Sequence, residues 1–239
     1  GLRFENVCYT YPETGIEAIK NLSFKLNPGE TLAITGRTGS GKSTVAQLCM
    51  RLMDPTSGVV SYNGINLKHY PLSEFKSSTG YVPQDVFLFS DTIENNISFG
   101  TTDTNKSNKQ SIENAAKLSA VHSDIVGLEN GYQTILGERG VNLSGGQKQR
   151  ISISRALLRK PDLLILDDCL SAVDTSTEKH IINSLQSLKE QNPLTSTLMV
   201  SHRISTIMHA NNIIVIDEGI IVESGTHNEL LKSGGLYAE

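Results

Sequence analysis

The chain has 239 residues, of which 38% are hydrophobic and 19% charged, and this is typical of a globular protein with one substantial core. Aromatic residues make up only 5% of the sequence and tryptophan is absent, so a surface that stacks nucleic-acid bases is not favoured. The net charge of −4 also argues against a nucleic-acid-binding protein. The three cysteines, Cys8, Cys49 and Cys169, fit neither a disulfide framework nor a zinc site, and we expect them to be reduced.

No apolar run approaches the roughly 18–20 residues of a membrane-spanning helix, and no charged-then-apolar leader opens the chain. The first residue is Gly1 and not an initiator methionine, so we expect the sequence to be a piece of a longer protein.

Short β-rich runs alternate with helical patterns, which predicts an α/β fold with a mostly parallel sheet covered by helices. The expected strands are residues 2–8, 22–26, 31–35, 59–62, 163–167 and 197–201, followed by a hairpin of 213–217 and 220–223 that turns at Glu218-Gly219. The expected helices are residues 43–53, 112–119, 146–159 and 176–189. Residues 101–111 are rich in Ser, Thr and Asn and predict a surface loop.

The β pattern disappears between about residues 85 and 160. We therefore expect residues 85–159 to form a helical subdomain inserted into a core of residues 1–84 and 160–239, all within a single domain.

The sequence GRTGSGKS, residues 36–43, fits the phosphate-binding pattern G-x-x-x-x-G-K-[ST] and lies between an expected strand and an expected helix. Its glycines let backbone N–H groups point at phosphate oxygens, and the helix N-terminus adds partial positive charge. We expect Lys42 to reach the β- and γ-phosphates and the Ser43 hydroxyl to bind Mg²⁺. The alternative is a glycine-rich turn with a solvated lysine. The candidate nucleotide-binding residues of this P-loop are Gly36, Arg37, Thr38, Gly39, Ser40, Gly41, Lys42, Ser43 and Thr44.

The sequence LSGGQ, residues 143–147, opens the expected helix 146–159. Ser144 and Gln147 have the spacing of a capping box, which explains a helix start. The capping box does not explain Gly145 and Gly146, because glycine is a poor helix former. We expect these glycines to let an anion approach the helix N-terminus closely.

Two aspartates, Asp167 and Asp168, follow the apolar run Leu163–Leu166. Asp167 at the tip of a buried strand is expected to bind Mg²⁺, because this hard cation takes oxygen ligands. Asp168 could be a second catalytic acid, a weakened replacement for one, or a turn residue.

LSGGQ, placed between GRTGSGKS and LLILDD, resembles the signature of the nucleotide-binding domains of ATP-binding cassette (ABC) transporters. The resemblance covers essentially the whole chain. It implies the ABC ATPase fold: a P-loop NTPase core with a mostly parallel sheet, an antiparallel β subdomain and an inserted helical subdomain. It also implies ATP and Mg²⁺ as ligands.

The resemblance assigns roles to further residues. Tyr11, in YTYPETG, matches the aromatic residue that stacks on adenine, and Gln84, in GYVPQD, matches the glutamine that links the γ-phosphate and metal site to the helical subdomain. His202, in VSHR, matches the histidine that contacts the γ-phosphate, and residues 171–174, SAVD, match the loop that touches the opposing subunit. Taken alone, Tyr11 fits a half-buried strand aromatic, Gln84 a surface turn, and His202 a structural histidine.

The family dimerises head to tail, which implies that each ATP lies between the P-loop of one domain and Ser144, Gly145, Gly146 and Gln147 of the other. The implied partners are a second ABC ATPase domain and a transmembrane domain of the same polypeptide, at the cytoplasmic face of the membrane. GERG, residues 137–140, and the Leu236-Tyr237 ending resemble exporters of the multidrug or lipid type. The apolar run Val86–Phe89 fits either core packing or a groove for a cytoplasmic loop of the membrane domain.

Asp168 departs from the family, which usually has glutamate at this position to orient or deprotonate the attacking water. Aspartate is shorter by one methylene, roughly 1.5 Å of reach, and positioning errors of about 1 Å can cost on the order of 100-fold in rate. We therefore expect ATP binding with slow hydrolysis. A heterodimer in which this P-loop belongs to the weaker site would explain the change, and a homodimer that tolerates aspartate is the alternative, favoured slightly by an intact His202.

Three functions are consistent with the sequence. The first is an ATPase motor domain of a membrane exporter, and the second is an ATP-gated clamp that does not hydrolyse because Asp168 fails. The third is a soluble cassette ATPase of repair or translation, which GERG and the missing start methionine disfavour.

Overall fold

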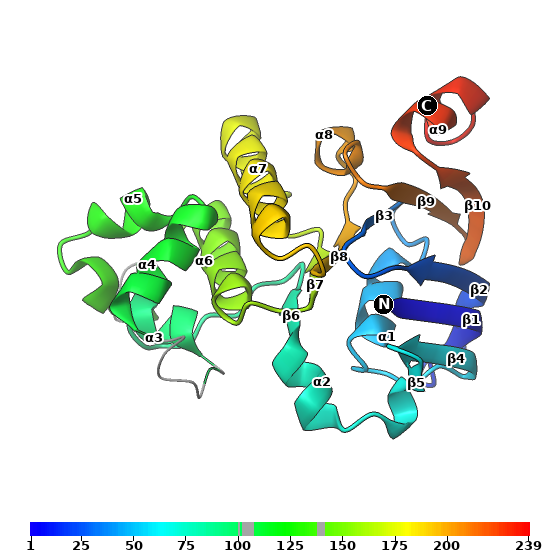
Figure 1. Cartoon of the computed structure of the whole chain (residues 1–239), viewed down its shortest axis with the longest axis horizontal. Helices are drawn as coiled ribbons and strands as arrows, with labels where there is room; N and C mark the ends of the chain where they lie inside the picture. Colours follow the sequence, from blue (N-terminus) through cyan, green and yellow to red (C-terminus); the bar gives the residue numbers. More distant parts are fainter. Residues whose placement is uncertain (100, 102–107, 138–141) are drawn as a thin grey trace. The chain divides into compact units, whose positions relative to one another are not determined.

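The computed structural model describes residues 1–99, 101, 108–137 and 142–239, which form two compact units (Figure 1). The first unit contains residues 1–81, 162–168 and 194–239. The second contains residues 82–161 and 169–193.

A six-stranded sheet with the order β10-β9-β3-β8-β7-β6 forms the centre of the first unit (Figure 1). Strands β9, β3, β8 and β7 are parallel, and β10 runs antiparallel to β9. All residues of β7 and β8 are buried, which explains their nearly continuous apolar sequence. The strands are β3 (Thr31–Thr35), β6 (Thr79–Val82), β7 (Leu163–Asp167), β8 (Ser196–Val200), β9 (Asn212–Asp217) and β10 (Ile220–Gly225).

A four-stranded antiparallel sheet with the order β2-β1-β4-β5 completes the first unit. Its strands are β1 (Leu2–Thr10), β2 (Glu17–Leu26), β4 (Ser57–Tyr62) and β5 (Ile65–Asn66). Helix α1 (Lys42–Cys49) contributes Val45 and Leu48 to a core that also contains Phe4 from this sheet and Ile165 from the parallel sheet. One apolar core therefore fixes α1 relative to both sheets. The remaining helices of the unit are short: η1 (Leu67–His69), α2 (Leu72–Ser78), α8 (Ile204–Ile207) and α9 (His227–Ser233).

The second unit is helical, apart from an isolated bridge between Thr92 and Ile135 among its described residues. Its core contains Ile97, Ile112, Ile125 and Ile151, one from each of four helices. The helices of the unit are α3 (Ile93–Ser98), α4 (Lys109–Leu118), α5 (His122–Val126), η2 (Gly131–Gln133), α6 (Gly145–Leu158) and α7 (Thr175–Gln191).

The predicted fold class, an ABC ATPase fold of the α/β class, is confirmed. All eight expected strands and four expected helices are present, with ends shifted by a few residues. Helix α4 begins at Lys109, inside the predicted loop 101–111, because the side chain of Asn108 accepts a hydrogen bond from Ser111 N and caps the helix. Residues 102–107 of that loop lie outside the described residues.

The predicted division into a core and an inserted subdomain stays a prediction. The compact units follow it to within three residues, except that residues 169–193, predicted as part of the core, belong to the second unit. The reason is that α7 packs against α4.

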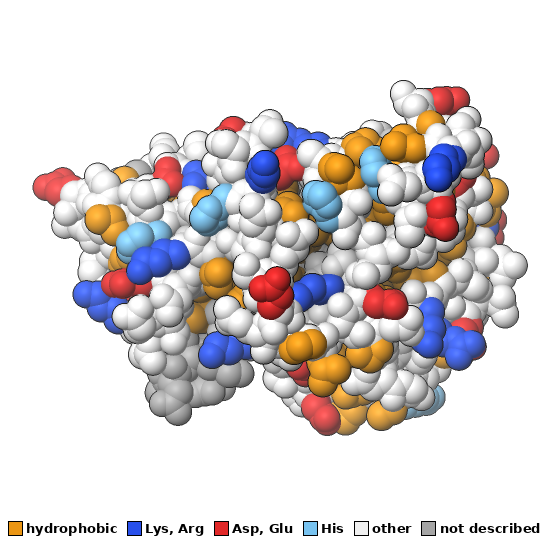
Figure 2. All heavy atoms as spheres, turned by 45° about the horizontal axis from the view of Figure 1, so that its top comes forward, with side chains coloured by type: hydrophobic (Ala, Val, Ile, Leu, Met, Phe, Trp, Pro, Cys, Tyr) orange, Lys and Arg blue, Asp and Glu red, His pale blue; other side chains and the backbone are white. Residues whose placement is uncertain are grey.

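The helices that the structure describes include none with the length and apolar character of a membrane span. On the face shown in Figure 2, the described Lys and Arg side chains are interspersed with Asp and Glu and form no continuous basic surface.

Gly58 in β4 tests the packing of the four-stranded sheet. Its φ is +80°, and a Cβ atom would overlap the carbonyl group of Asn6, whereas Gly64 has a similar φ of +82° and open space around it. We expect Gly58→Ala to lower the free energy of unfolding by about 3 kcal/mol and Gly64→Ala by only about 1 kcal/mol. Urea unfolding measures both values, and equal costs would mean that backbone conformation alone decides them.

Candidate functional site

The P-loop leaves β3 at its carboxyl end and is supported from behind by the β9–β10 hairpin. The N–H of Gly219, in the hairpin turn, donates to the carbonyl oxygen of Ser40 at 3.1 Å. Gly36, with φ of +142°, lies so close to the carbonyl of Ile216 that a Cβ atom would overlap it. Gly39 and Gly41 also have positive φ, +78° and +103°. The curled backbone that a phosphate cradle needs is therefore built into the unit.

Lys42 folds back over the loop that precedes it. Its ammonium donates to the carbonyl oxygens of Gly36 at 2.9 Å and Arg37 at 2.7 Å. Burial lowers the pKa of Lys42, and the carboxylates of Asp168 and Asp167 oppose this shift. The amine is thus held beside the loop by the same carbonyls that shape it.

The N-terminus of α1 matches the chemistry of a phosphate. Gly41 is the N-cap, no side chain caps the helix, and no acidic residue lies in its first turn. The hydroxyl of Ser40 is buried without a hydrogen-bond partner. Free donors at a helix start and a lone buried hydroxyl beside them suit an anion, so these residues fit a bound polyphosphate.

The hydroxyl of Ser43 donates to Oδ1 of Asp167 at 3.0 Å, which brings the two predicted metal ligands together. Burial raises the pKa of Asp167, while the hydrogen bond from Ser43 and the nearby Lys42 oppose the shift. A hydroxyl and a carboxylate side by side form a donor set that Mg²⁺ accepts, because this cation is commonly held by few protein oxygens together with water and phosphate. The residues therefore fit the cation.

Asp168 follows the strand end in an unusual backbone conformation. Its φ is +43°, in the left-handed region, and its N–H donates to the carbonyl of Val200 at 2.9 Å. Aspartate tolerates this region better than most residues with longer side chains. Asp168 is half-buried, whereas Asp167 is buried. The two neighbouring carboxylates therefore have different surroundings.

His202 is exposed and lies two residues after the end of β8, at the edge where β3 and β7 also end. The N–H of Ser201 donates to the carbonyl of Ile34 at 3.2 Å, which aligns the ends of β8 and β3. Gln84 is exposed and belongs to the second unit. Its predicted role at the metal site stays a prediction.

The side chain of Tyr11 contacts the helix that begins at the P-loop. Its hydroxyl lies 2.9 Å from Oγ1 of Thr44, and its ring packs edge-on against Tyr9 with centroids 5.1 Å apart. The ring is half-buried. The structure thus brings Tyr11 to the P-loop, and stacking on adenine stays a prediction.

The segment Leu143–Gln147 begins α6 with the predicted capping box. The hydroxyl oxygen of Ser144 accepts from the N–H of Gln147 at 3.2 Å, and Oε1 of Gln147 accepts from the N–H of Ser144 at 3.0 Å. Ser144 and Gly145 are exposed.

The two glycines of this segment have different surroundings. A Cβ atom on Gly146 would lie 2.8 Å from the carbonyl oxygen of Ala172, closer than real Cβ contacts, so Gly146 is needed by packing inside the second unit. A Cβ atom on Gly145 would meet only the Ala172 side chain at 3.6 Å, an ordinary contact. Packing against Ala172 therefore explains Gly146 without an incoming anion. At Gly145 no such packing constraint exists, so the expectation that the glycine admits an anion has no competing explanation there.

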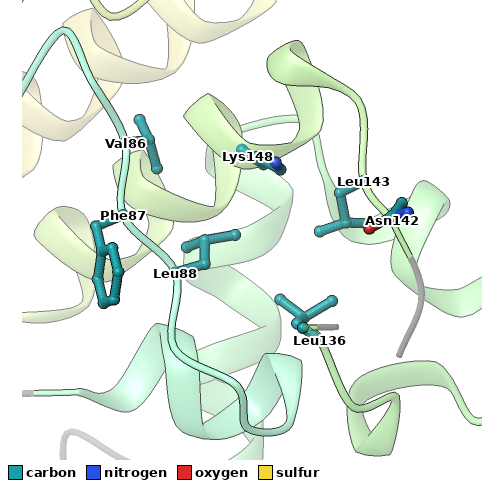
Figure 3. A pocket seen from close by; sticks show the side chains of 8 residues that line it. Val86, Phe87, Leu88, Leu136, Asn142, Leu143 and Lys148 are labelled. Atoms are coloured by element: carbon teal, nitrogen blue, oxygen red, sulfur yellow. The ribbon is translucent and has the colours of Figure 1, made fainter. Parts of the chain in front are cut away.

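A cavity of about 240 Å³ lies beside this segment and is lined by part of the apolar run Val86–Phe89. Figure 3 shows Leu88, Leu136 and Leu143 turned toward one another, with Phe87 on the other side of its segment. Leu88 packs against the helical core, whereas Phe87 is 68% exposed. Core packing therefore holds for Leu88, and a groove for a loop of the membrane domain at Phe87 stays a prediction. Of GERG, Gly137 lines the cavity, while Glu138, Arg139 and Gly140 lie outside the described residues.

Comparison with known families identifies the family of the chain. Residues 19–171 match the model of a family described as ABC transporter. The chain belongs to the ABC transporter family. This membership confirms the resemblance drawn from LSGGQ and the P-loop, and with it a nucleotide-binding ATPase domain.

Curated relatives are similar over nearly the whole chain. The ABC transporter ATP-binding protein YfiB of Bacillus subtilis is 45% identical over 99% of the chain, and an ATP-dependent lipid A-core flippase of Salmonella paratyphi A is 44% identical over 100%. A solved bacterial Atm1-family ABC exporter with ATP bound matches with a TM-score of 0.91 and 38% identity over 99% of the chain. The chain spans 40% of the length of each of these proteins.

Three contacts of this ABC domain were not expected from its sequence: Gly219 behind the P-loop, Ala172 against Gly146, and Asp124 beside Gln147. For the first contact the sequence did offer a signal, because it predicts a hairpin turn at Glu218-Gly219. Both residues have the positive φ of such a turn. The other two are tertiary contacts without a local pattern.

The unequal surroundings of the two glycines predict unequal effects of alanine. We expect Gly146→Ala to lower the free energy of unfolding by about 2 kcal/mol, because the Ala172 backbone must move. Gly145→Ala should leave it unchanged or raise it by up to about 1 kcal/mol, since alanine is the better helix former. Thermal or urea unfolding measures both variants. A harmless Gly146→Ala would contradict the packing role of this glycine.

Proposed function

We propose that the chain is the Mg²⁺-dependent, ATP-hydrolysing motor domain of an ABC exporter, which dimerises around two ATP molecules to drive substrate export across a membrane. The observation that carries this proposal is the single sheet edge at which the P-loop, the Ser43–Asp167 pair, Asp168 and His202 meet. The names of the similar proteins, a flippase and an exporter with ATP bound, support it.

In the proposed binding step, the glycines of the P-loop and the start of α1 surround the phosphates with backbone N–H groups. Lys42 exchanges its carbonyl partners at Gly36 and Arg37 for the β- and γ-phosphates, which compensate its charge better than neutral carbonyls do. Tyr11 provides a ring face for adenine, while its hydroxyl stays on Thr44.

Ser43 and Asp167 would hold Mg²⁺, which neutralises charge on the phosphates when bound. Asp167 suits this role because it is buried beside Ser43 and points at the P-loop. Asp168 would orient or deprotonate the attacking water, and His202 would contact the γ-phosphate. Because aspartate is shorter than glutamate by roughly 1.5 Å, we propose that this water is held less well and hydrolysis is slow.

The exposed start of α6 is proposed to complete the nucleotide site of a second ABC domain. Gly145 carries no side chain there, and Ser144 offers a hydroxyl. A heterodimer in which the chain's own P-loop forms the weaker site is favoured by Asp168. A homodimer remains the alternative.

The proposed third partner is a transmembrane domain of the same polypeptide, which places this domain at the cytoplasmic face of the membrane. Phe87, exposed beside the 240 Å³ cavity of the second unit, offers an apolar surface for a loop of that domain.

Ser144→Arg tests the shared site. The larger side chain of arginine should block approach of the partner's nucleotide. The ATP concentration needed for half-maximal dimerisation should therefore rise by about tenfold or more, which corresponds to about 1.4 kcal/mol of binding free energy. Analytical ultracentrifugation measures dimerisation, and a fluorescent ATP analogue measures binding to the monomer, which should not change. Asn130→Arg, an exposed position of the same unit, is the matched control. Normal ATP-dependent dimerisation of Ser144→Arg would contradict a shared site.

Asp168→Glu tests the proposed slow hydrolysis. The added methylene should raise steady-state phosphate release, by up to about 100-fold. The left-handed backbone should at the same time cost about 1 kcal/mol of stability, because glutamate tolerates positive φ less well. Asp168→Asn keeps the backbone preference without the carboxylate and should abolish the remaining hydrolysis at unchanged stability. Equal phosphate release from all three proteins would instead support the non-hydrolysing clamp.

A further inference from the structure

Asp124, in the first turn of α5, lies between two residues of α6. Its Oδ1 accepts a hydrogen bond from Nε2 of Gln147 at 3.0 Å, and its Oδ2 accepts from a terminal nitrogen of Arg150 at 2.8 Å. Arg150 is fixed in turn, because it also donates to the carbonyl oxygens of Ala120 and Gly146. A continuous chain of polar contacts therefore leads from Arg150 through Asp124 to the start of α6.

The direction of these hydrogen bonds determines how the Gln147 amide is oriented. An ionised carboxylate can only accept, so the NH₂ group of Gln147 must face Asp124. The amide oxygen then faces the opposite way, where it accepts from the N–H of Ser144 and closes the capping box. The reversed amide would place its NH₂ group against that N–H, and the capping box would open.

The capping box also decides what the Ser144 hydroxyl can do. Its oxygen accepts the N–H of Gln147, which leaves the hydroxyl proton to be donated outward from an exposed position. A phosphate oxygen can accept this hydrogen bond, and the N-terminus of α6 adds favourable partial charge.

We propose that Asp124 is a positioning residue for the shared nucleotide site: by fixing the Gln147 amide, it aims the Ser144 hydroxyl at the triphosphate held by the P-loop of a second domain. The inference rests on the proposed dimer. It adds to it a residue outside the P-loop and outside Leu143–Gln147.

The surroundings of Asp124 suit this task. The side chain of Arg150 is only 13% exposed and that of Asp124 30%, so the pair is less screened by solvent than a surface ion pair. Burial disfavours the charged carboxylate, but the hydrogen bonds from Gln147 and Arg150 outweigh it and lower the pKa of Asp124. The carboxylate therefore stays ionised and keeps its role as an acceptor.

Asp124→Asn tests the proposal with almost no change of shape. Asparagine has one acceptor for two donors, Arg150 and Gln147, so the Gln147 amide should reverse and release Ser144. We expect the Ser144 amide proton to exchange at least about fivefold faster in the nucleotide-free chain, measured by NMR. The ATP concentration for half-maximal dimerisation should rise about tenfold, with ATP affinity of the monomer within about twofold of the unchanged chain.

The double variant Asp124→Asn with Gln147→Glu separates positioning from general destabilisation. It moves the carboxylate to position 147 at unchanged net charge, where one oxygen can accept from the new amide at position 124 and the other from the N–H of Ser144. Exchange at Ser144 should return to within about twofold of the unchanged chain. His122→Ala is the matched control, because His122 lies in α5 as Asp124 does. The substitution removes the 2.8 Å contact between His122 and Tyr132 without touching α6.

Each result decides a separate point. Unchanged exchange at Ser144 in Asp124→Asn, equal effects of His122→Ala, or failure of the double variant to restore protection would overturn the positioning role. If the unchanged chain does not dimerise with ATP, the proposed shared site fails, and the exchange measurements still decide whether Asp124 orients Gln147. Faster exchange with unchanged dimerisation would show that the orientation has no effect on the site, and this too would overturn the proposal.

Discussion

The parallel hydrogen-bond ladder between β3, β8 and β7 is the constraint on which the nucleotide site depends. Continuing beyond the strands, the N–H of Asp168 donates to Val200 and the N–H of Ser201 donates to Ile34. These bonds bring three chain segments, distant in sequence, to one edge of the sheet, where the P-loop also begins. No side-chain contact is needed to align them, because the register of the backbone does so.

The same ladder gives the two neighbouring aspartates different properties. Asp167 is the last residue of β7, is buried and has its pKa raised by that burial, so a cation would stabilise its charged form. Asp168 leaves the strand in a left-handed conformation that turns its side chain out of the strand's alternation. One residue thus suits a metal ligand and the next a group that faces water. A backbone that favours aspartate also gives a structural reason for the shorter acid, independent of any loss of activity.

The sequence predicted the elements whose signals are local. Apolar runs such as Leu163–Leu166 and the glycine pattern of the P-loop determine strand, turn and helix within about ten residues, and all were found. The strand Thr79–Val82 and the helix Leu72–Ser78 are too short for a periodic pattern and were missed. Residues 169–193 look like part of the core in sequence because they follow β7, and only the packing of α7 on α4 assigns them to the second unit. Membership of a compact unit is a tertiary property, so no local pattern encodes it.

At the start of α6, two glycines that match the same motif have different surroundings. Gly146 is required by the Ala172 carbonyl of its own unit, whereas Gly145 meets no such obstacle and stays exposed. A scan of the sequence cannot separate the two glycines, because both match the same pattern. The division has a physical consequence for the proposed dimer: Gly146 lies tightly against the Ala172 backbone, so the helix start could not shift to accept a misplaced phosphate. Orientation of the remaining donors must then come from side chains, and Ser144 is oriented through Gln147. In the proposed dimer, the precision of the shared site would therefore be set inside the second unit before any nucleotide is present.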